Sequence, residues 1–382
     1  MRISAMLLVL VLSLVGCGQK PAEETKNEIT VETQSEEKAE DNTQAEAKTI
    51  AAEDMTVGFI FIGPIGDGGY TYAHNEGREY LKEQLGVKTI YQESVPEGPE
   101  VEKVLRDMID QGANAIFATS FGYMDYVEKV AKEYPEVKFL HCSGYKSGDN
   151  FVNYFGRMYE PRFLSGIVAG LKTETNKIGY VGAYNISEVV RGINAFTLGV
   201  QAVNPDAQVD VRWTNTWYDP AKEKEAAKSL LDVGCDVIAQ HQDTAGPQQA
   251  AEEAGKFAIG YNTISEEKAP KAYMTAPIWN WGVYYVEQVD QMLKGTWTAE
   301  NVWKGMDADF VQLAPLTENA PKEAASVVAE YTEKIKSGEF QVFGGVITKQ
   351  DGTTIGEEGK VLDDATLLSM KWFVKGVNGS IE

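Results

Sequence analysis

From residue 55 onward, short apolar runs alternate with stretches in which apolar residues recur at helical spacing. Runs of about five apolar and β-branched residues are typical of buried strands. They predict a first series of strands at 56–62, 88–93, 115–120, 138–142 and 151–155, and a second series at 177–181, 208–214, 236–240, 257–260 and 272–277.

The segments between these strands carry helix signals. Apolar residues recur every three or four positions in 99–111, which is the spacing of one helix face. Asp219 followed by Pro220 predicts a helix start, because aspartate caps a helix and proline fits its first turn. Ser187 is a second candidate cap, for a helix that runs to 203 and is stopped by Asn204 and Pro205.

Strands that alternate with helices predict an α/β fold with parallel sheets covered by helices on both faces. Two successive series predict two such lobes. In open α/β sheets a ligand binds beyond the carboxyl ends of the strands. We therefore expect a ligand cleft between the lobes and look for functional residues at the strand ends.

Aromatic, carboxylate and amide side chains recur at those ends. A single aromatic residue in a loop usually packs against its own domain, but recurrence at six strand ends favours a site for a flat, hydrogen-bonding ligand. The candidate ligand-binding residues are Asp67, Tyr70, Tyr72, Phe121, Trp217, Asp243, Asn262, Trp279 and Asn280.

Composition narrows the function. The 382 residues include 57 acidic and 35 basic ones, a net charge of −22, which disfavours nucleic-acid binding because an anionic surface repels phosphate. Three cysteines exclude a disulfide scaffold, and we expect Cys142 and Cys235, in different lobes, to be unpaired. Three scattered histidines disfavour a metal site, and no cofactor is expected.

The N-terminus has the pattern of a targeting signal. An aliphatic run over residues 7–12 is too short to span a bilayer and ends at Leu14-Val15-Gly16-Cys17. This ending resembles a bacterial lipobox, in which the cysteine is acylated; an ordinary signal peptide with an incidental cysteine is the alternative. Residues 18–54 contain no aromatic residue and predict a disordered acidic tether.

Five segments resemble the basic membrane protein family, the purine-nucleoside-receptor-like substrate-binding lipoproteins of ABC importers. They are GPIGDGGYTYAHNEGR, VPEG, SFGYMD, NTWYDP and WFVKGVNG, and the similarity extends over 55–382. The resemblance implies a type I periplasmic-binding-protein fold, with two Rossmann-like lobes joined by three crossovers. It also implies an ABC permease as partner and no catalytic activity.

The N-terminal pattern and the resemblance together predict an order of parts along the chain. These are a signal peptide over 1–17, the tether over 18–54, lobe 1 over 55–159, lobe 2 over 160–278, and a return to lobe 1 plus a C-terminal segment over 279–382. We expect the protein to be a monomer that a lipid on Cys17 anchors to the extracytoplasmic face of the cell membrane. We expect its lobes to hinge near 153–160 and 279–283.

Family residues transfer to this sequence one at a time. The acid and aromatic of the first loop match Asp67 and Tyr70, the stacking aromatic of lobe 2 matches Trp217, and the purine-binding carboxylate matches Asp243. The tyrosine-rich first loop resembles a branch whose suspected ligands are adenine-type bases. Two aromatic rings can enclose the faces of a purine while carboxylates and amides bind its polar edge.

Two departures from the family pattern favour a free base over a nucleoside. Nucleoside-binding members often carry a ribose-contacting lysine where this sequence has Trp279. They also commonly carry an acid after the fourth strand, where this sequence reads Cys-Ser-Gly-Tyr over 142–145.

Other functions stay open at this point. Asp67, Asp243 and His241 could serve acid–base catalysis, but no nucleophile elbow, Walker loop or zinc motif accompanies them. A sugar or signal receptor of the same fold could grip hydroxyls with Arg157, Arg162 and Arg191, although Arg157 and Arg162 could instead form structural ion pairs. A signalling receptor is not excluded, and a transcription factor is disfavoured because the lipobox and tether occupy the place of a DNA-binding domain.

Overall fold

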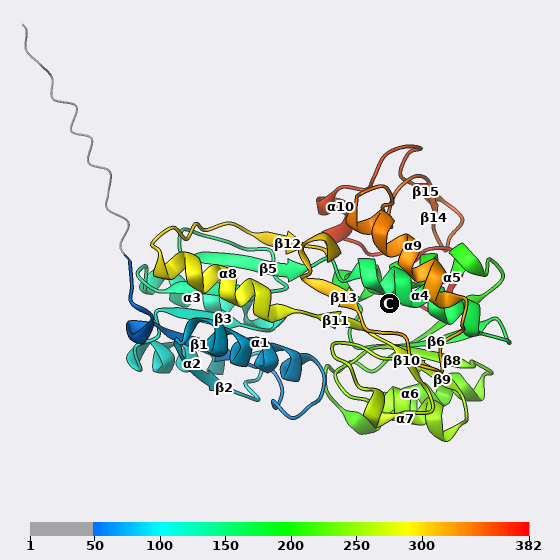
Figure 1. Ribbon diagram of the computed structural model, residues 1–382, viewed down its shortest axis with the longest axis horizontal. Helices are drawn as coiled ribbons and strands as arrows, with labels where there is room; N and C mark the ends of the chain where they lie inside the picture. The colour runs from blue at the N-terminus through cyan, green and yellow to red at the C-terminus, as the bar shows by residue number, and fades with distance from the viewer. Residues whose placement is uncertain (1–48, 382) are drawn as a thin grey trace, which may run out of the picture. The chain divides into compact units, whose positions relative to one another are not determined.

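The computed structural model describes residues 49–381, which form two six-stranded parallel sheets with helices on both faces of each (Figure 1). Cys17 and residues 18–48 of the predicted tether lie outside the described residues. Residues 49–54, expected to be disordered, instead pack on the fold: they include the 3-10 turn η1 (Ala52–Asp54), and the Ile50 amide donates to the Leu293 carbonyl at 3.0 Å.

The sheet of lobe 1 has the strand order β12-β5-β4-β3-β1-β2. Its strands are β1 (Thr56–Ile60), β2 (Lys88–Gln92), β3 (Ala115–Ala118), β4 (Lys138–Cys142), β5 (Phe151–Gly156) and β12 (Val302–Lys304). The first five match the first predicted series, whereas β12 comes from the end of the chain's second visit to this lobe.

The sheet of lobe 2 has the order β10-β9-β8-β6-β7-β16. Its strands are β6 (Lys177–Gly182), β7 (Gln208–Trp213), β8 (Val237–His241), β9 (Phe257–Ile259), β10 (Tyr273–Thr275) and β16 (Val377–Asn378). The predicted strand at 272–277 divides at Ala276: β10 stays in this sheet, and the next strand leaves it. The C-terminal segment therefore extends the sheet of lobe 2, through β16 beside β7.

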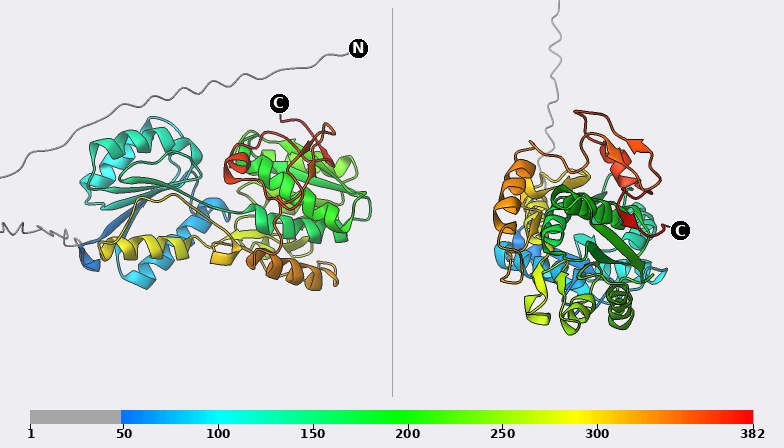
Figure 2. Two further views of the ribbon diagram at one scale, coloured as in Figure 1. Left: turned by 90° about the horizontal axis from the view of Figure 1, so that it is seen from above. Right: turned by 90° about the vertical axis from the view of Figure 1, so that its right-hand side faces the viewer.

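Helices cover both faces of each sheet (Figure 2). In lobe 1, α1 (Tyr70–Leu85) packs on α8 (Trp281–Leu293), and α2 (Glu100–Asp110) packs on α3 (Met124–Glu133). In lobe 2, α4 (Tyr159–Lys172) packs on α5 (Ser187–Val203), and α6 (Pro220–Asp232) packs on α7 (Gly246–Glu253). The helix α9 (Ala324–Lys336) lies on α4.

The smaller elements are peripheral to these layers. They comprise η2 (Phe121–Tyr123), η3 (Glu266–Lys268), η4 (Met306–Ala308), β14 (Ile347–Thr348), β15 (Thr354–Ile355) and α10 (Asp364–Leu368).

Two helix starts show how local sequence fixes the elements. The Asp219 carboxylate accepts a hydrogen bond from the Lys222 amide at 3.0 Å, and Pro220 occupies the first turn, which confirms the predicted start of α6. The predicted cap at Ser187 is wrong. Ile186 holds the extended cap conformation, with φ −89° and ψ 160°, so Ser187 is already the first helical residue of α5 and no side chain caps that end.

The chain passes between the lobes three times, after β5, after β10 and after β12. The second and third passes pair with each other as the antiparallel strands β11 (Pro277–Trp279) and β13 (Val311–Leu313). A continuous apolar core extends from lobe 1 through α4 into lobe 2. Cys142 and Cys235 are free and buried in different lobes, as expected, and no helix within 49–381 is long and apolar enough to span a membrane.

Candidate functional site

A cavity lies where the carboxyl ends of the two sheets face each other, and it holds about 360 Å³ of empty space. Its lining comes from both lobes: Ile62, Tyr70, Ser120, Phe121 and Ser143 from lobe 1, and Glu188, Trp217, His241, Asp243 and Tyr261 from lobe 2.

Aromatic rings from opposite lobes form the apolar walls. Tyr70 begins α1, and its hydroxyl donates to the Cys142 sulfur at 3.3 Å. Trp217 follows β7 and meets the ring of Tyr184 edge-on at 5.1 Å. Each ring is thus held by contacts within its own lobe, and both rings line the cavity.

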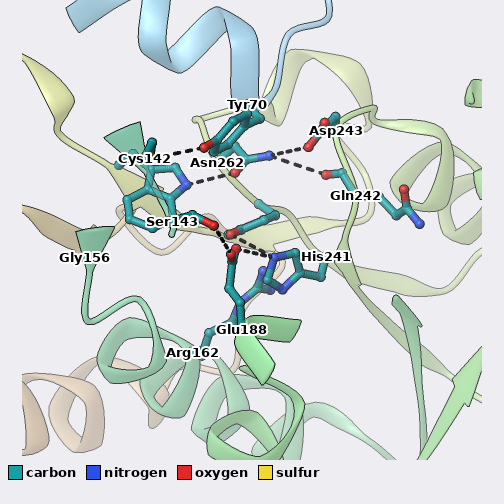
Figure 3. Close-up of polar contacts among 12 residues, drawn as sticks. Tyr70, Cys142, Ser143, Gly156, Arg162, Glu188, His241, Gln242, Asp243 and Asn262 are labelled. Atoms are coloured by element: carbon teal, nitrogen blue, oxygen red, sulfur yellow. Dashed lines mark hydrogen bonds and ion pairs between the residues drawn. The ribbon is translucent and has the colours of Figure 1, made fainter. Parts of the chain in front are cut away.

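Asp243 is the buried carboxyl of the cavity, with 6% of its surface exposed. Its Oδ1 accepts from Asn262 Nδ2 at 3.3 Å, and no residue within 49–381 donates to Oδ2 (Figure 3). Burial raises the pKa of this carboxyl well above its usual range, and the charges of Asp67 and Glu223 raise it further. A buried carboxyl with an unused oxygen can bind the polar edge of a ligand.

A second carboxyl group, that of Glu188 in lobe 2, connects the two lobes through a hydrogen bond beside the cavity. Ser143 Oγ donates to Glu188 Oε2 at 2.9 Å, and His241 Nε2 lies 3.3 Å from Glu188 Oε1 (Figure 3). Burial lowers the pKa of His241 to about 4, so its imidazole is neutral at neutral pH. The Tyr261 hydroxyl lies 3.2 Å from the same His241 nitrogen, which completes a chain of fixed polar groups.

Four of the nine predicted residues line this cavity, namely Tyr70, Phe121, Trp217 and Asp243. Asp67 does not. Its carboxylate accepts backbone N–H groups of Gly69, Thr71 and Tyr72 at 2.8–2.9 Å and so stabilises the loop that leads into α1. Tyr72 is 38% exposed and does not line the cavity.

The remaining three residues lie behind or away from the cavity. Asn262 is fully buried and connects Asp243 to the Trp279 indole, whose Nε1 donates to Asn262 Oδ1 at 2.9 Å. Trp279 stacks on Trp281 with ring centroids 4.2 Å apart, and Asn280 donates to the Asp309 carbonyl. The positions of Trp279 and Asn280 follow from the pairing of β11 with β13, which carries this segment away from the cavity.

Six lining residues were not among the predicted ligand-binding residues: Ile62, Ser120, Ser143, Glu188, His241 and Tyr261. Most of them follow strands, so the strand-end rule could have found them. Glu188 lies in the first turn of α5, and only its contact with Ser143 from the other lobe reveals its place.

The two lobes touch across the cavity. Thr263 Oγ1 of lobe 2 donates to the Gly68 carbonyl of lobe 1 at 2.6 Å. A Cβ atom at Gly69 would lie 2.0 Å from the Asp243 carbonyl oxygen, so this approach needs glycine. The described conformation is therefore closed over the cavity.

Comparison with protein families matches residues 55–344 to the Bmp family, described as ABC transporter substrate-binding proteins similar to PnrA. A purine-binding protein of Brucella abortus is 44% identical over 333 residues, which cover 87% of this chain and 95% of that protein. A protein of Haloferax volcanii, named as a candidate glucose-binding protein of an ABC transporter, is 37% identical over 86% of this chain and 82% of its own length.

Solved structures share the fold. A solute-binding protein of an ABC transporter from Aeropyrum pernix aligns with a TM-score of 0.68 at 22% identity, over 75% of this chain and 92% of its own. One from Conexibacter woesei aligns with a TM-score of 0.64 at 24% identity, over 75% and 98%. The predicted two-lobed periplasmic-binding-protein fold is confirmed.

Proposed function

Because this chain belongs to the Bmp family of PnrA-like ABC transporter substrate-binding proteins, we propose that it captures a purine base, adenine or a close relative, between its lobes. A member of this extracytoplasmic family binds a substrate for a membrane permease and performs no catalysis. The purine-binding name of the Brucella abortus relative supports a purine as the substrate of this cavity.

The observation that carries the proposal is the pairing of flat aromatic walls with one buried carboxyl. A purine has two apolar faces and a polar edge. Tyr70 and Trp217 both line the cavity, and in this proposal they cover the two faces. Base–aromatic stacking contributes about 1–3 kcal/mol per base. The free oxygen of Asp243 can bond an N–H of the ring or of an exocyclic amine.

A free base fits the cavity better than a nucleoside. The cavity is closed by contacts between the lobes, and a ribose requires several hydroxyl partners. Trp279 occupies the sequence position of the ribose-contacting lysine of nucleoside-binding relatives. In this chain it contributes indirectly, because its indole N–H fixes the Asn262 amide that holds Asp243.

A sugar is the second candidate, favoured by the resemblance to the Haloferax volcanii protein. The arginines that could grip hydroxyls do not line the cavity. Arg162 lies over the Tyr261 ring at 3.7 Å, and Arg157 and Arg191 line a neighbouring groove. This placement favours the purine.

Titration calorimetry with adenine, hypoxanthine, guanine, adenosine and glucose tests the proposal. We expect adenine or another purine base to bind more tightly than adenosine, and glucose to give no heat. Tight binding of glucose alone would overturn the purine assignment, and adenosine binding without adenine binding would overturn the preference for a base.

We also propose that a lipid on Cys17 anchors the protein to the membrane. There it acts as a monomer beside an ABC permease. Stable anchoring needs two or more acyl chains, which a lipobox cysteine supplies. Cys17→Ala is expected to leave the protein uncleaved or released as a soluble form. Cell fractionation with intact-mass measurement checks this, and a normally processed Cys17→Ala protein in the membrane fraction would contradict it.

A further inference from the structure

The cavity borders a much larger groove between the lobes, with about 1570 Å³ of empty space. The two spaces share three lining residues, Phe121, Ser143 and Glu188. These three side chains therefore form the partition between the closed cavity and the open groove, and we call them the partition.

The partition exists only when the lobes are closed. Phe121 and Ser143 follow β3 and β4 of lobe 1, whereas Glu188 belongs to α5 of lobe 2. The bond from Ser143 Oγ to Glu188 Oε2, at 2.9 Å, joins its two halves.

Lobe 2 holds Glu188 in position for this contact. Its other oxygen lies 3.3 Å from His241 Nε2, and His241 in turn contacts the Tyr261 hydroxyl. The side chain of Glu188 is only 16% exposed. Rotating it away from this position would break its contacts with both Ser143 and His241. A rigid partition results, because each of its polar atoms has a partner.

We infer that Glu188, closed onto Ser143, is a specificity-determining residue that excludes purines carrying a ribosyl substituent. The inference rests on the proposed function. In this inference a base lies beside Tyr70, Trp217 and Asp243, and the sugar of a nucleoside extends past the partition into the groove. Its sugar would then break the Ser143–Glu188 bond and leave a carboxylate without that partner.

The groove beyond the partition could accommodate a sugar. Arg191 lines it and is 4% exposed, and its Nη1 donates to the Leu367 carbonyl. Its Nε and Nη2 have no hydrogen-bond partner within residues 49–381. Asn185 lines the same groove. Removing the partition would thus give ribose hydroxyls both space and donors.

The test is calorimetry with adenine and adenosine on four variants, read as the ratio of the two affinities. In the wild type we expect adenine to bind more tightly. Glu188→Ala should shift the ratio toward adenosine by about tenfold or more, the size expected for relieving a charged hydrogen bond. Ser143→Ala should shift it in the same direction by a smaller factor.

Two controls separate shape from charge and from general effects. Glu188→Gln keeps the length and can still accept from Ser143 through a neutral hydrogen bond, so it should retain part of the discrimination, and more than Glu188→Ala. Glu225→Ala removes an exposed glutamate of α6 and should leave the ratio unchanged. If Glu188→Ala fails to fold, Ser143→Ala decides, because it deletes only a hydroxyl.

The outcomes distinguish the two levels of the proposal. Adenine binding with an unchanged ratio in Glu188→Ala or Ser143→Ala would overturn the partition and leave the proposed function intact. A wild type that binds no purine would overturn both.

Discussion

Trp217 lines the cavity from lobe 2 and is oriented by Tyr184, so the proposed stacking of a purine base depends directly on this side chain. Trp217→Ala is expected to weaken adenine binding by roughly ten- to a hundredfold, since stacking contributes about 1–3 kcal/mol. Calorimetry measures this loss. Tyr72→Ala is the matched control: Tyr72 is 38% exposed and should not affect affinity. Equal effects of both changes would contradict the assignment.

Asp243 offers a test of polar recognition that preserves the local structure. In Asp243→Asn the Asn262 amide can still donate to the new side-chain oxygen, so the contact at 3.3 Å can be kept. We expect weaker adenine binding and a changed ranking among adenine, hypoxanthine and guanine, because the amide donates and accepts differently from a carboxyl. A competition assay with the three bases measures this, and an unchanged ranking would contradict it.

At the scale of elements, Glu160 joins two of the crossovers. It lies in the first turn of α4, and its Oε2 accepts from the Met306 amide that follows β12, at 2.7 Å. Burial raises the pKa of Glu160 to about 7. The folded state therefore binds this proton more tightly than the unfolded state, and the free energy of unfolding falls as pH rises from about 4.5 to 7.

Glu160→Gln removes this pH dependence and can keep the hydrogen bond from Met306. The free energy of unfolding of the variant minus that of the wild type should therefore be larger at pH 8 than at pH 5, by about 1–3 kcal/mol. One unit of pKa shift corresponds to about 1.4 kcal/mol. Urea unfolding of both proteins at the two pH values measures the difference. If the variant and the wild type differ in stability by the same amount at both pH values, Glu160 does not titrate in this range as expected.

At the scale of the whole molecule, we expect the lobes to hinge about the three crossovers, with the contacts between the lobes as the closed end of that motion. Adenine should reduce the radius of gyration in small-angle scattering. It should also raise the melting temperature, because binding at 100 times Kd stabilises the folded state by about 2.7 kcal/mol.

Gly69→Ala provides the control for closure, because its added methyl group would lie 2.0 Å from the Asp243 carbonyl oxygen. This variant should fold, bind adenine weakly and keep its radius of gyration when adenine is added. A wild-type radius that does not change at saturating adenine would argue against closure, while leaving binding itself intact.

The sequence by itself determined the two main series of strands and their order along the chain, up to residue 275. Nine of the ten predicted strands appear as single strands, α6 begins at Pro220 as expected, and α5 ends before Asn204. Local periodicity and caps depend on a few neighbouring residues, so they can be read without the fold. The strand-end rule also brought Tyr70, Phe121, Trp217 and Asp243 to one cavity, because parallel strands place their carboxyl ends together.

Only the tertiary structure decided how these ends meet. Ala276 lies within an apolar run, and the run is divided between two sheets because β11 pairs with β13, more than thirty residues later. That pairing carries Trp279 and Asn280 away from the cavity. Glu188 reaches the cavity through a contact with Ser143, 45 residues away in sequence and on the other lobe. Such positions follow from long-range packing between lobes, which no local pattern of residues encodes.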